Sequence, residues 1–306
     1  MDLHPQLRAM LDKAAGLAPM HTVPIAAIRA TDLGRYSFGV PKEAVALCED
    51  HAVPGPRGEI GVRVYRPARD GVLPVTMFFH GSGFCICSIE THDAMCRQIA
   101  NRAGSIVVSI DYGLAPEQPF PAGPDDCWAA TLWAAAAAAG WGGDPSRLAV
   151  CGDSAGGTMA AVVAQRARDE GGPAIAAQIL LYPVTDHYSA GHGSYEALGT
   201  GWGLTADGMR RFWDLYLPDP IAIPPWAAPA RHARLGGLPP AYVITAGYDL
   251  LRDEGEAYAA RLSAAGVPTT LTRYDDMNHG FLNWVGLVDR SGEAIDALGV
   301  WMRRNL

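Results

Sequence analysis

The sequence Gly152–Asp153–Ser154–Ala155–Gly156 constrains the fold of this chain more than any other feature. The apolar run 148–150 before it is typical of a buried strand, and the pattern over 158–169 is typical of a helix. In that context G-x-S-x-G predicts a sharp strand-to-helix turn, with the Ser154 hydroxyl exposed above a sheet. The glycines are needed because backbone segments pack too closely there for side chains. Ser154 is therefore a candidate nucleophile; the alternative is a glycine-rich turn that binds a phosphate or nothing.

The composition is that of a globular protein with a large core, since 49% of the residues are hydrophobic and 18% are charged. The net charge is −8 and no basic cluster occurs, which argues against a nucleic-acid partner. No apolar run reaches about 18 residues, so we expect no membrane span. The first twenty residues lack the apolar stretch of a signal peptide. With no export signal, the six cysteines indicate reduced thiols and a cytoplasmic location.

Predicted strands and helices alternate along the rest of the chain. Alternating Ile60, Val62 and Val64 predict an antiparallel strand near an edge. Apolar runs predict further strands at 75–79, 106–110, 148–150, 176–182, 241–246 and 269–274. Helical patterns occur at 89–102, 125–140, 158–169, 206–216, 254–265 and 291–304. This order predicts one α/β domain over residues 1–306, with a mainly parallel central sheet flanked by helices.

Two segments belong to no predicted strand. Residues 1–48 are helical in character, and residues 185–226 are too long for a connecting loop. We interpret them as a helical cap, although a mobile tail is the alternative for the first segment. The candidate substrate-pocket residues are Phe84 and, from the second segment, Trp202, Phe212 and Trp213; for the aromatic residues of that segment, core packing is the alternative.

Partners for Ser154 are expected at the carboxyl ends of the strands, where open α/β sheets place their sites. A serine hydroxyl needs a base to take its proton and an acid to orient that base. His279 follows the last predicted strand and Asp249 follows the preceding one, so the chain order is serine, aspartate, histidine. The rival acids are Asp253, expected within a helix, Asp275, and Asp276, expected one turn before His279. Asp249 is favoured as the acid.

The predicted strand 75–79 is followed at once by His80–Gly81–Ser82–Gly83, which looks like the HGGG-type loop that donates backbone N–H groups to an oxyanion. Ser82 replaces one glycine of that pattern, but a serine keeps its N–H group. Ala155, the residue after the candidate nucleophile, supplies a further N–H group by position.

Taken together, several motifs resemble those of the bacterial hormone-sensitive-lipase-like esterase family. They are His80–Gly81–Ser82–Gly83–Phe84, Asp111–Tyr112–Gly113–Leu114–Ala115–Pro116–Glu117, Gly152–Asp153–Ser154–Ala155–Gly156–Gly157, Asp249–Leu250–Leu251–Arg252–Asp253–Glu254 and His279–Gly280–Phe281. The resemblance implies an α/β-hydrolase fold with a helical cap, and ester hydrolysis without a cofactor or metal. It also implies an oxyanion hole formed by the N–H groups of Ser82, Gly83 and Ala155.

The chain departs from the family pattern at four positions, none of which removes a catalytic group: Ser82 for glycine, Gly113 for arginine, Gln118 for histidine and Leu250 for proline. We expect a carboxylesterase that hydrolyses short-chain acyl esters through an acyl-enzyme. An amidase, a lipase and a non-enzymatic receptor on the same fold are the alternatives; such receptors lose the triad histidine, whereas His279 is present. The expected partner is a small-molecule ester, and a homodimer is left open.

Overall fold

A computed structural model describes residues 2–14, 16–32, 39–218 and 221–306. Its centre is an eight-stranded sheet in the order β1-β2-β4-β3-β5-β6-β7-β8. The β1–β2 and β2–β4 pairs are antiparallel, and the other pairs are parallel. The strands are β1 (Leu47–Gly55), β2 (Gly58–Arg66), β3 (Leu73–Phe79), β4 (Ile106–Asp111), β5 (Gly143–Asp153), β6 (Ile175–Leu181), β7 (Ala241–Tyr248) and β8 (Thr269–Asn278). The expected mainly parallel sheet is confirmed.

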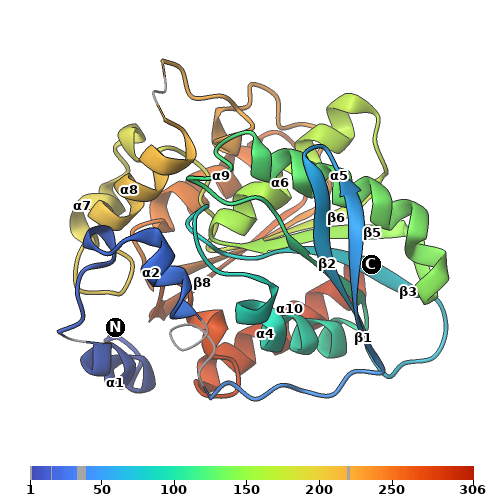
Figure 1. Ribbon diagram of the computed structural model, residues 1–306, viewed down its shortest axis with the longest axis horizontal. Coiled ribbons are helices and arrows are strands. Elements are labelled where there is room, and N and C mark those ends of the chain that lie inside the picture. Colours follow the sequence, from blue (N-terminus) through green and yellow to red (C-terminus); the bar gives the residue numbers. More distant parts are fainter. Residues whose placement is uncertain (1, 15, 33–38, 219–220) are drawn as a thin grey trace.

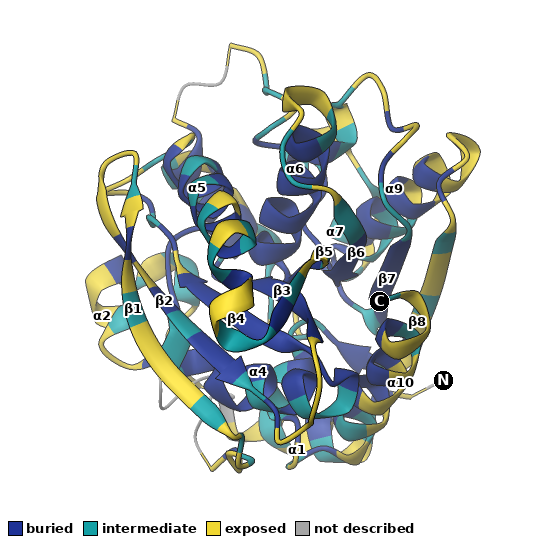
Figure 2. Ribbon diagram, turned by 90° about the vertical axis from the view of Figure 1, so that its right-hand side faces the viewer, coloured by how far each residue is buried: buried dark blue, intermediate teal, exposed yellow. Residues whose placement is uncertain are grey.

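The sheet separates two apolar cores, because successive side chains of a strand point to opposite faces. In β5, Leu148 and Val150 face one core, and Ala149 and Cys151 face the other. The first core is covered by α5 (Ala122–Ala137), α6 (Ala155–Glu170) and α9 (Arg252–Ala264), and the second by α4 (Ile89–Ala103) and α10 (Asp289–Asn305). Figure 2 shows the central strands buried between these layers. The short helices η2 (Ala138–Trp141) and η5 (Phe281–Trp284) lie in connections.

Three strands differ from the sequence prediction by more than two residues. β5 (Gly143–Asp153) is longer at both ends than the predicted run 148–150. β1 was not expected, because it lies at the edge of the sheet with mostly exposed side chains and contains Pro54, so it lacks an alternating apolar pattern. β8 continues to Asn278, four residues beyond the predicted end at 274, since Asn278 still pairs with Tyr248 of β7. Asp275 and Asp276 therefore lie within a strand.

The two segments expected to form a cap pack in part against each other (Figure 1). The first contains α1 (Pro5–Ala14), η1 (Met20–Thr22) and α2 (Ile25–Arg29), and the second contains η3 (Tyr188–Ala190), α7 (Gly193–Ala197) and α8 (Ala206–Tyr216). The short helix η4 (Pro229–Arg231) follows the second segment. Arg211 of α8 donates hydrogen bonds to the carbonyl oxygens of Met20 and Val23, at 2.9 and 2.6 Å. Helix α8 has the predicted bounds. Residues 1, 15, 33–38 and 219–220 of the expected cap lie outside the described residues.

None of the helices in the described ranges is long and apolar enough to cross a membrane.

Candidate active site

Ser154 lies on the turn between β5 and α6, with φ 54° and ψ −121°. A non-glycine residue in this region of backbone space carries strain of about 1–3 kcal/mol. The turn is also crowded. A Cβ on Gly152 would lie 2.1 Å from the Gly156 carbonyl oxygen, and one on Gly156 would lie 1.9 Å from the Phe79 carbonyl oxygen. The sharp turn expected from G-x-S-x-G therefore requires both glycines.

His279 lies between Ser154 and Asp249 at the carboxyl end of the sheet. Its Nε2 is 2.9 Å from Ser154 Oγ, and its Nδ1 is 2.7 Å from Asp249 Oδ2. Asp249 is 1% exposed, and its other oxygen accepts the Leu251 N–H group at 2.9 Å. A neutral imidazole that donates from Nδ1 to Asp249 presents its Nε2 lone pair to the Ser154 hydroxyl. The structure thus brings together the three residues singled out in the sequence.

Each rival acid binds a different partner. Asp253 accepts the Ser194 N–H group at 2.8 Å and pairs with Arg252. The other two, in β8, lie near arginines: Asp275 is 3.8 Å from Arg273, and Asp276 is 3.5 Å from Arg290. Of these four carboxylates, Asp249 is the one that lies within hydrogen-bond distance of His279.

The loop after β3 lies directly beside the Ser154 turn. The Gly81 N–H group donates to Asp153 Oδ1 at 2.6 Å. Among the described residues, no acceptor takes the N–H groups of Ser82, Gly83 or Ala155. These are the three groups that the family resemblance implies for an oxyanion hole.

A buried polar cluster of His92, Asp153 and His80 lies next to this loop. His92 Nε2 lies 3.3 Å from Asp153 Oδ1, and both side chains are buried. Burial opposes ionisation of Asp153, but the nearby His92 and the Gly81 N–H group hold the pKa of its carboxyl below the usual value. Burial, reinforced by His92, lowers the pKa of His80 to about 3. The sequence analysis missed His92, because a lone histidine within a helical pattern carries no signal.

Tyr182 is a second residue that the sequence analysis did not single out. It follows β6 with φ 35°, an unusual backbone conformation for a bulky residue. Its ring packs edge-on against the His279 imidazole, with 5.0 Å between ring centroids. Tyr182 therefore limits the orientations open to the imidazole. In the sequence it was indistinguishable from the last residue of a strand.

Three of the four candidate pocket residues lie together in or beside residues 80–84 of the loop after β3. This segment is called the oxyanion loop below, after its expected role. A Cβ on Gly83 would lie 2.5 Å from Phe212 Cδ2, so the Phe212 ring rests directly on that loop. Phe84 stacks on Tyr216 with 3.9 Å between centroids and packs against Trp213, which is fully buried. Helix α8 therefore lies against the loop that carries the unpaired N–H groups of Ser82 and Gly83.

Trp202 is not part of that group. It packs on Tyr248 with 4.4 Å between centroids, and its carbonyl oxygen accepts the Asn278 side chain at 2.9 Å. Trp202 and Tyr248 pack against the second core, on the opposite side of the sheet from Phe84, Phe212 and Trp213. Nearness in sequence to Phe212 did not determine where Trp202 lies.

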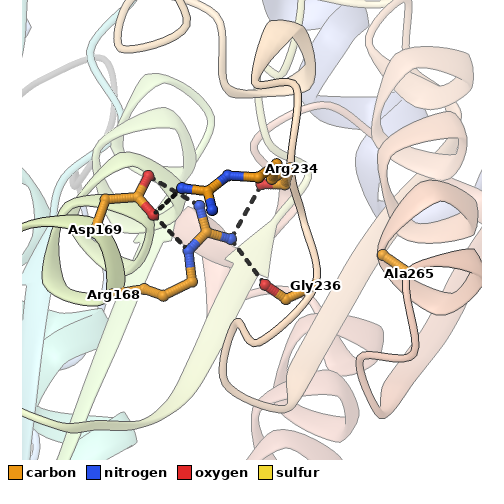
Figure 3. Close-up of a pocket in the computed structure, with 5 residues that line it drawn as sticks. All are labelled: Arg168, Asp169, Arg234, Gly236 and Ala265. Atoms are coloured by element: carbon orange, nitrogen blue, oxygen red, sulfur yellow. Dashed lines mark hydrogen bonds and ion pairs between the residues drawn. The ribbon is translucent and has the colours of Figure 1, made fainter.

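A cavity of about 570 Å³ lies at the other end of α6, lined by Arg168, Asp169, Arg234, Gly236 and Ala265 (Figure 3). Arg168 is 14 residues along the helix from Ser154, or about 21 Å by helical rise. Its guanidinium donates to both Asp169 oxygens and to the carbonyl oxygens of Arg234 and Gly236. These groups tie the 234–236 loop to α6, so we assign the cavity a structural role.

Within the described residues, no cluster of three or more histidine, cysteine, aspartate or glutamate side chains could hold a metal ion. The arrangement of Ser154, His279 and Asp249 matches that of the nucleophile, base and orienting acid of a serine hydrolase.

Comparisons with known proteins agree with this geometry. The family described as alpha/beta hydrolase fold matches residues 76–283. Esterase LipI of Mycobacterium tuberculosis is 44% identical over 255 residues, covering 80% of this chain and 78% of LipI. The ethyl acetate hydrolase of Pseudomonas putida is 31% identical over 311 residues, covering 96% of each protein. A hyperthermophilic esterase from the archaeon Pyrobaculum calidifontis has a TM-score of 0.94 and 39% identity, covering 99% of each chain.

The fold and the family match define an α/β hydrolase. Within that class, the chain belongs to the hormone-sensitive-lipase-like esterase family, and it is a carboxylesterase.

Proposed function

We propose that this chain hydrolyses carboxylic esters with short acyl chains, using Ser154 as nucleophile, His279 as base and Asp249 as orienting acid. One observation carries the proposal. A line of two hydrogen-bond contacts, 2.7 and 2.9 Å long, joins a buried aspartate, a histidine and a serine held on a strained turn.

The first half-reaction forms an acyl-enzyme. Ser154 Oγ attacks the ester carbonyl carbon while His279 Nε2 takes the hydroxyl proton, and Asp249 stabilises the resulting imidazolium. The negative charge that develops on the carbonyl oxygen is met by the N–H groups of Ser82, Gly83 and Ala155. Collapse of this intermediate breaks the bond to the alcohol oxygen, which receives the proton from His279.

The second half-reaction repeats these steps with water. His279 takes a proton from the water molecule, whose oxygen attacks the acyl carbon of the Ser154 ester. The same three N–H groups meet the second oxyanion. Breaking the bond to Ser154 Oγ releases the carboxylic acid and returns the proton to the serine.

The preference for short chains rests on the aromatic residues beside the oxyanion loop. The Phe212 ring lies on Gly83, and Phe84, the next residue, packs with Trp213 and Tyr216. Large rings therefore fill the space beside the proposed oxyanion N–H groups. The name of the ethyl acetate hydrolase relative supports the same assignment.

Ser154→Ala tests the nucleophile. We expect kcat on p-nitrophenyl acetate to fall by up to about 10⁶-fold, leaving residual catalysis from the rest of the site. Ser263→Ala, which changes an exposed serine of α9, is the matched control and should keep native activity. A Ser154→Ala protein that retained a tenth of native activity would disprove the assignment.

The acyl-chain limit is tested with p-nitrophenyl esters from acetate to palmitate. Each buried CH₂ group contributes about 0.8 kcal/mol, so kcat/KM should rise with chain length and then drop where the pocket ends, within about two to eight carbons. Phe212→Ala should move that drop to longer chains if the ring forms the wall. An unchanged profile with a lower melting temperature would assign Phe212 to the core instead.

A further inference from the structure

We infer that the Ser82 hydroxyl, together with Tyr112, is a positioning device that holds the oxyanion N–H groups in place through a directed chain of hydrogen bonds. This inference rests on the proposed function, because it concerns how the same site is held. It assigns a role to the side chain at a position where the family usually has glycine.

The segment that carries the N–H groups of Ser82 and Gly83 has an unfavourable backbone. Gly83 has φ 51° and the next residue, Phe84, has φ 65°. The left-handed conformation is costly for a bulky residue such as phenylalanine. Such a conformation persists only when surrounding contacts determine it, so the contacts of this segment decide where its N–H groups point.

Three hydrogen bonds cross the segment, and their directions follow from the chemistry of the groups. Tyr112 Oη lies 2.7 Å from the His80 carbonyl oxygen, which only accepts, so the phenol donates its one proton there. Tyr112 Oη also lies 2.7 Å from Ser82 Oγ, so that hydrogen bond must be donated by the serine. The Phe84 N–H group donates to Ser82 Oγ at 2.8 Å.

The chain therefore runs from Phe84 N–H to Ser82 Oγ, from Ser82 O–H to Tyr112 Oη, and from Tyr112 O–H to the His80 carbonyl oxygen. His80 precedes the two N–H groups in sequence and Phe84 follows them. The hydrogen-bond chain therefore joins the residue before these groups to the residue after them. It also directs the serine proton to Tyr112, which leaves the backbone N–H groups of Ser82 and Gly83 as the donors for the oxyanion.

The groups of this hydrogen-bond chain are buried, so water cannot replace them. Ser82 is 3% exposed, Tyr112 is 2% exposed and His80 is fully buried. The His80 ring stacks on the Tyr112 ring with 4.6 Å between centroids and 21° between planes, which fixes the phenol over the loop. Burial raises the pKa of Tyr112 well above its usual value, so the phenol keeps its proton. Removing the Ser82 hydroxyl would leave the buried Phe84 N–H group without this acceptor.

The test measures kcat, KM and transition-state binding in Ser82→Ala, Tyr112→Phe and the double variant. Both half-reactions pass through an oxyanion, so we expect kcat to fall with KM almost unchanged. Loss of a whole oxyanion donor costs 10²–10³-fold; displaced donors should cost less, about tenfold. The inhibition constant of a trifluoromethyl ketone, which adds to Ser154 and forms an oxyanion, should weaken by the same factor as kcat/KM.

The double variant should be no slower than the slower single variant by more than about twofold, because both changes break one chain. Ser105→Ala is the matched control. Ser105 is a fully buried serine that donates to the Pro74 carbonyl oxygen and contacts the Thr76 hydroxyl, at the opposite end of β3 and β4. It should lower the melting temperature and leave kcat and inhibitor binding unchanged.

Labelling of Ser154 by an organophosphate counts the folded sites in every variant. Native kcat and native ketone affinity in both single variants would overturn the inference, and so would an activity loss that only matched the loss of labelled sites. If Ser82→Ala fails to fold, Tyr112→Phe decides by the same criteria. Full activity of Ser154→Ala would instead overturn the proposed function, so the two failures are distinguishable.

Discussion

The two ends of α6 each lie beside a histidine–aspartate pair, and of these two pairs one contacts a serine hydroxyl. Near the first turn, His279 Nδ1 lies 2.7 Å from Asp249 Oδ2, and Ser154 is the N-cap residue of the helix. Near the last turn, His232 Nε2 lies 3.0 Å from Asp169 Oδ2. In contact distance alone the two pairs are similar.

The two pairs differ in what contacts the second nitrogen of each imidazole. His279 Nε2 faces the Ser154 hydroxyl, whereas His232 Nδ1 accepts the Arg234 N–H group at 3.1 Å. Asp169 is also bound by Arg168, and its side chain is 24% exposed, while that of Asp249 is fully buried. A histidine–aspartate pair can therefore act as a base only where one lone pair is left for a nucleophile. Where every donor and acceptor is paired, the same residues hold the chain together.

Of the changes that compare the two pairs, removing the charge of the first pair should have the largest effect. Asp249→Asn should lower kcat by about 10⁴-fold, because an amide in place of the carboxylate favours the wrong imidazole tautomer. The measurement is steady-state hydrolysis of p-nitrophenyl acetate. Asp253→Asn, the same change at the rival acid, should stay within a few fold of native. Equal losses in both variants would remove Asp249 from its role.

Lowering the pH should reduce the free energy of unfolding through His80, which lies beside the Ser154 turn. The folded-state pKa of His80 is about 3, below its value of about 6.5 in an unfolded chain. Between these values the folded state binds fewer protons than the unfolded state, so the free energy of unfolding falls as the pH is lowered through this window. The total change is on the order of several kcal/mol.

Urea unfolding at pH 7, 6, 5 and 4 measures this dependence. His80→Asn should flatten it, whatever it does to stability at pH 7. Ser105→Ala, which changes a buried side chain without removing a titratable group, is the matched control and should leave the slope close to native. A native slope in His80→Asn would show that other groups cause the acid sensitivity.

The smallest expected effect comes from the second pair. Asp169→Asn weakens the hydrogen bonds from Arg168 and His232, and should lower the free energy of unfolding by about 1 kcal/mol, because the site is partly exposed. Esterase activity should stay within about twofold of native. A loss of kcat comparable to that of Asp249→Asn would contradict the structural role of this end of α6.

Much of the fold could be predicted from the sequence, because buried parallel strands are continuous apolar runs and amphipathic helices repeat locally. β3, β4, β6 and β7 fall where these runs predicted, and α8 has the predicted bounds. β1 could not be predicted, since an exposed edge strand has no apolar pattern and is held by its pairing with β2.

The candidate site divides in the same way. Gly152, Ser154 and Gly156 could be found in sequence because the turn places steric demands on neighbouring residues, and Asp249 and His279 because strand ends converge at one edge of a sheet. Chain order alone did not give the distances among them. It also left open whether Trp202 lies with Phe212, and the structure places the two on different cores.

The sequence by itself determined the strained serine turn, the alternation of strands and helices and the residues that follow the strands, because each depends on local geometry or on burial of a short segment. Only the tertiary structure decided which side chains meet. Strands β3 and β4 are neighbours in the sheet, so Tyr112, after β4, reaches Ser82, after β3, across 30 residues of sequence. Such contacts depend on strand order and side-chain packing, and these follow from the energy of the whole folded chain.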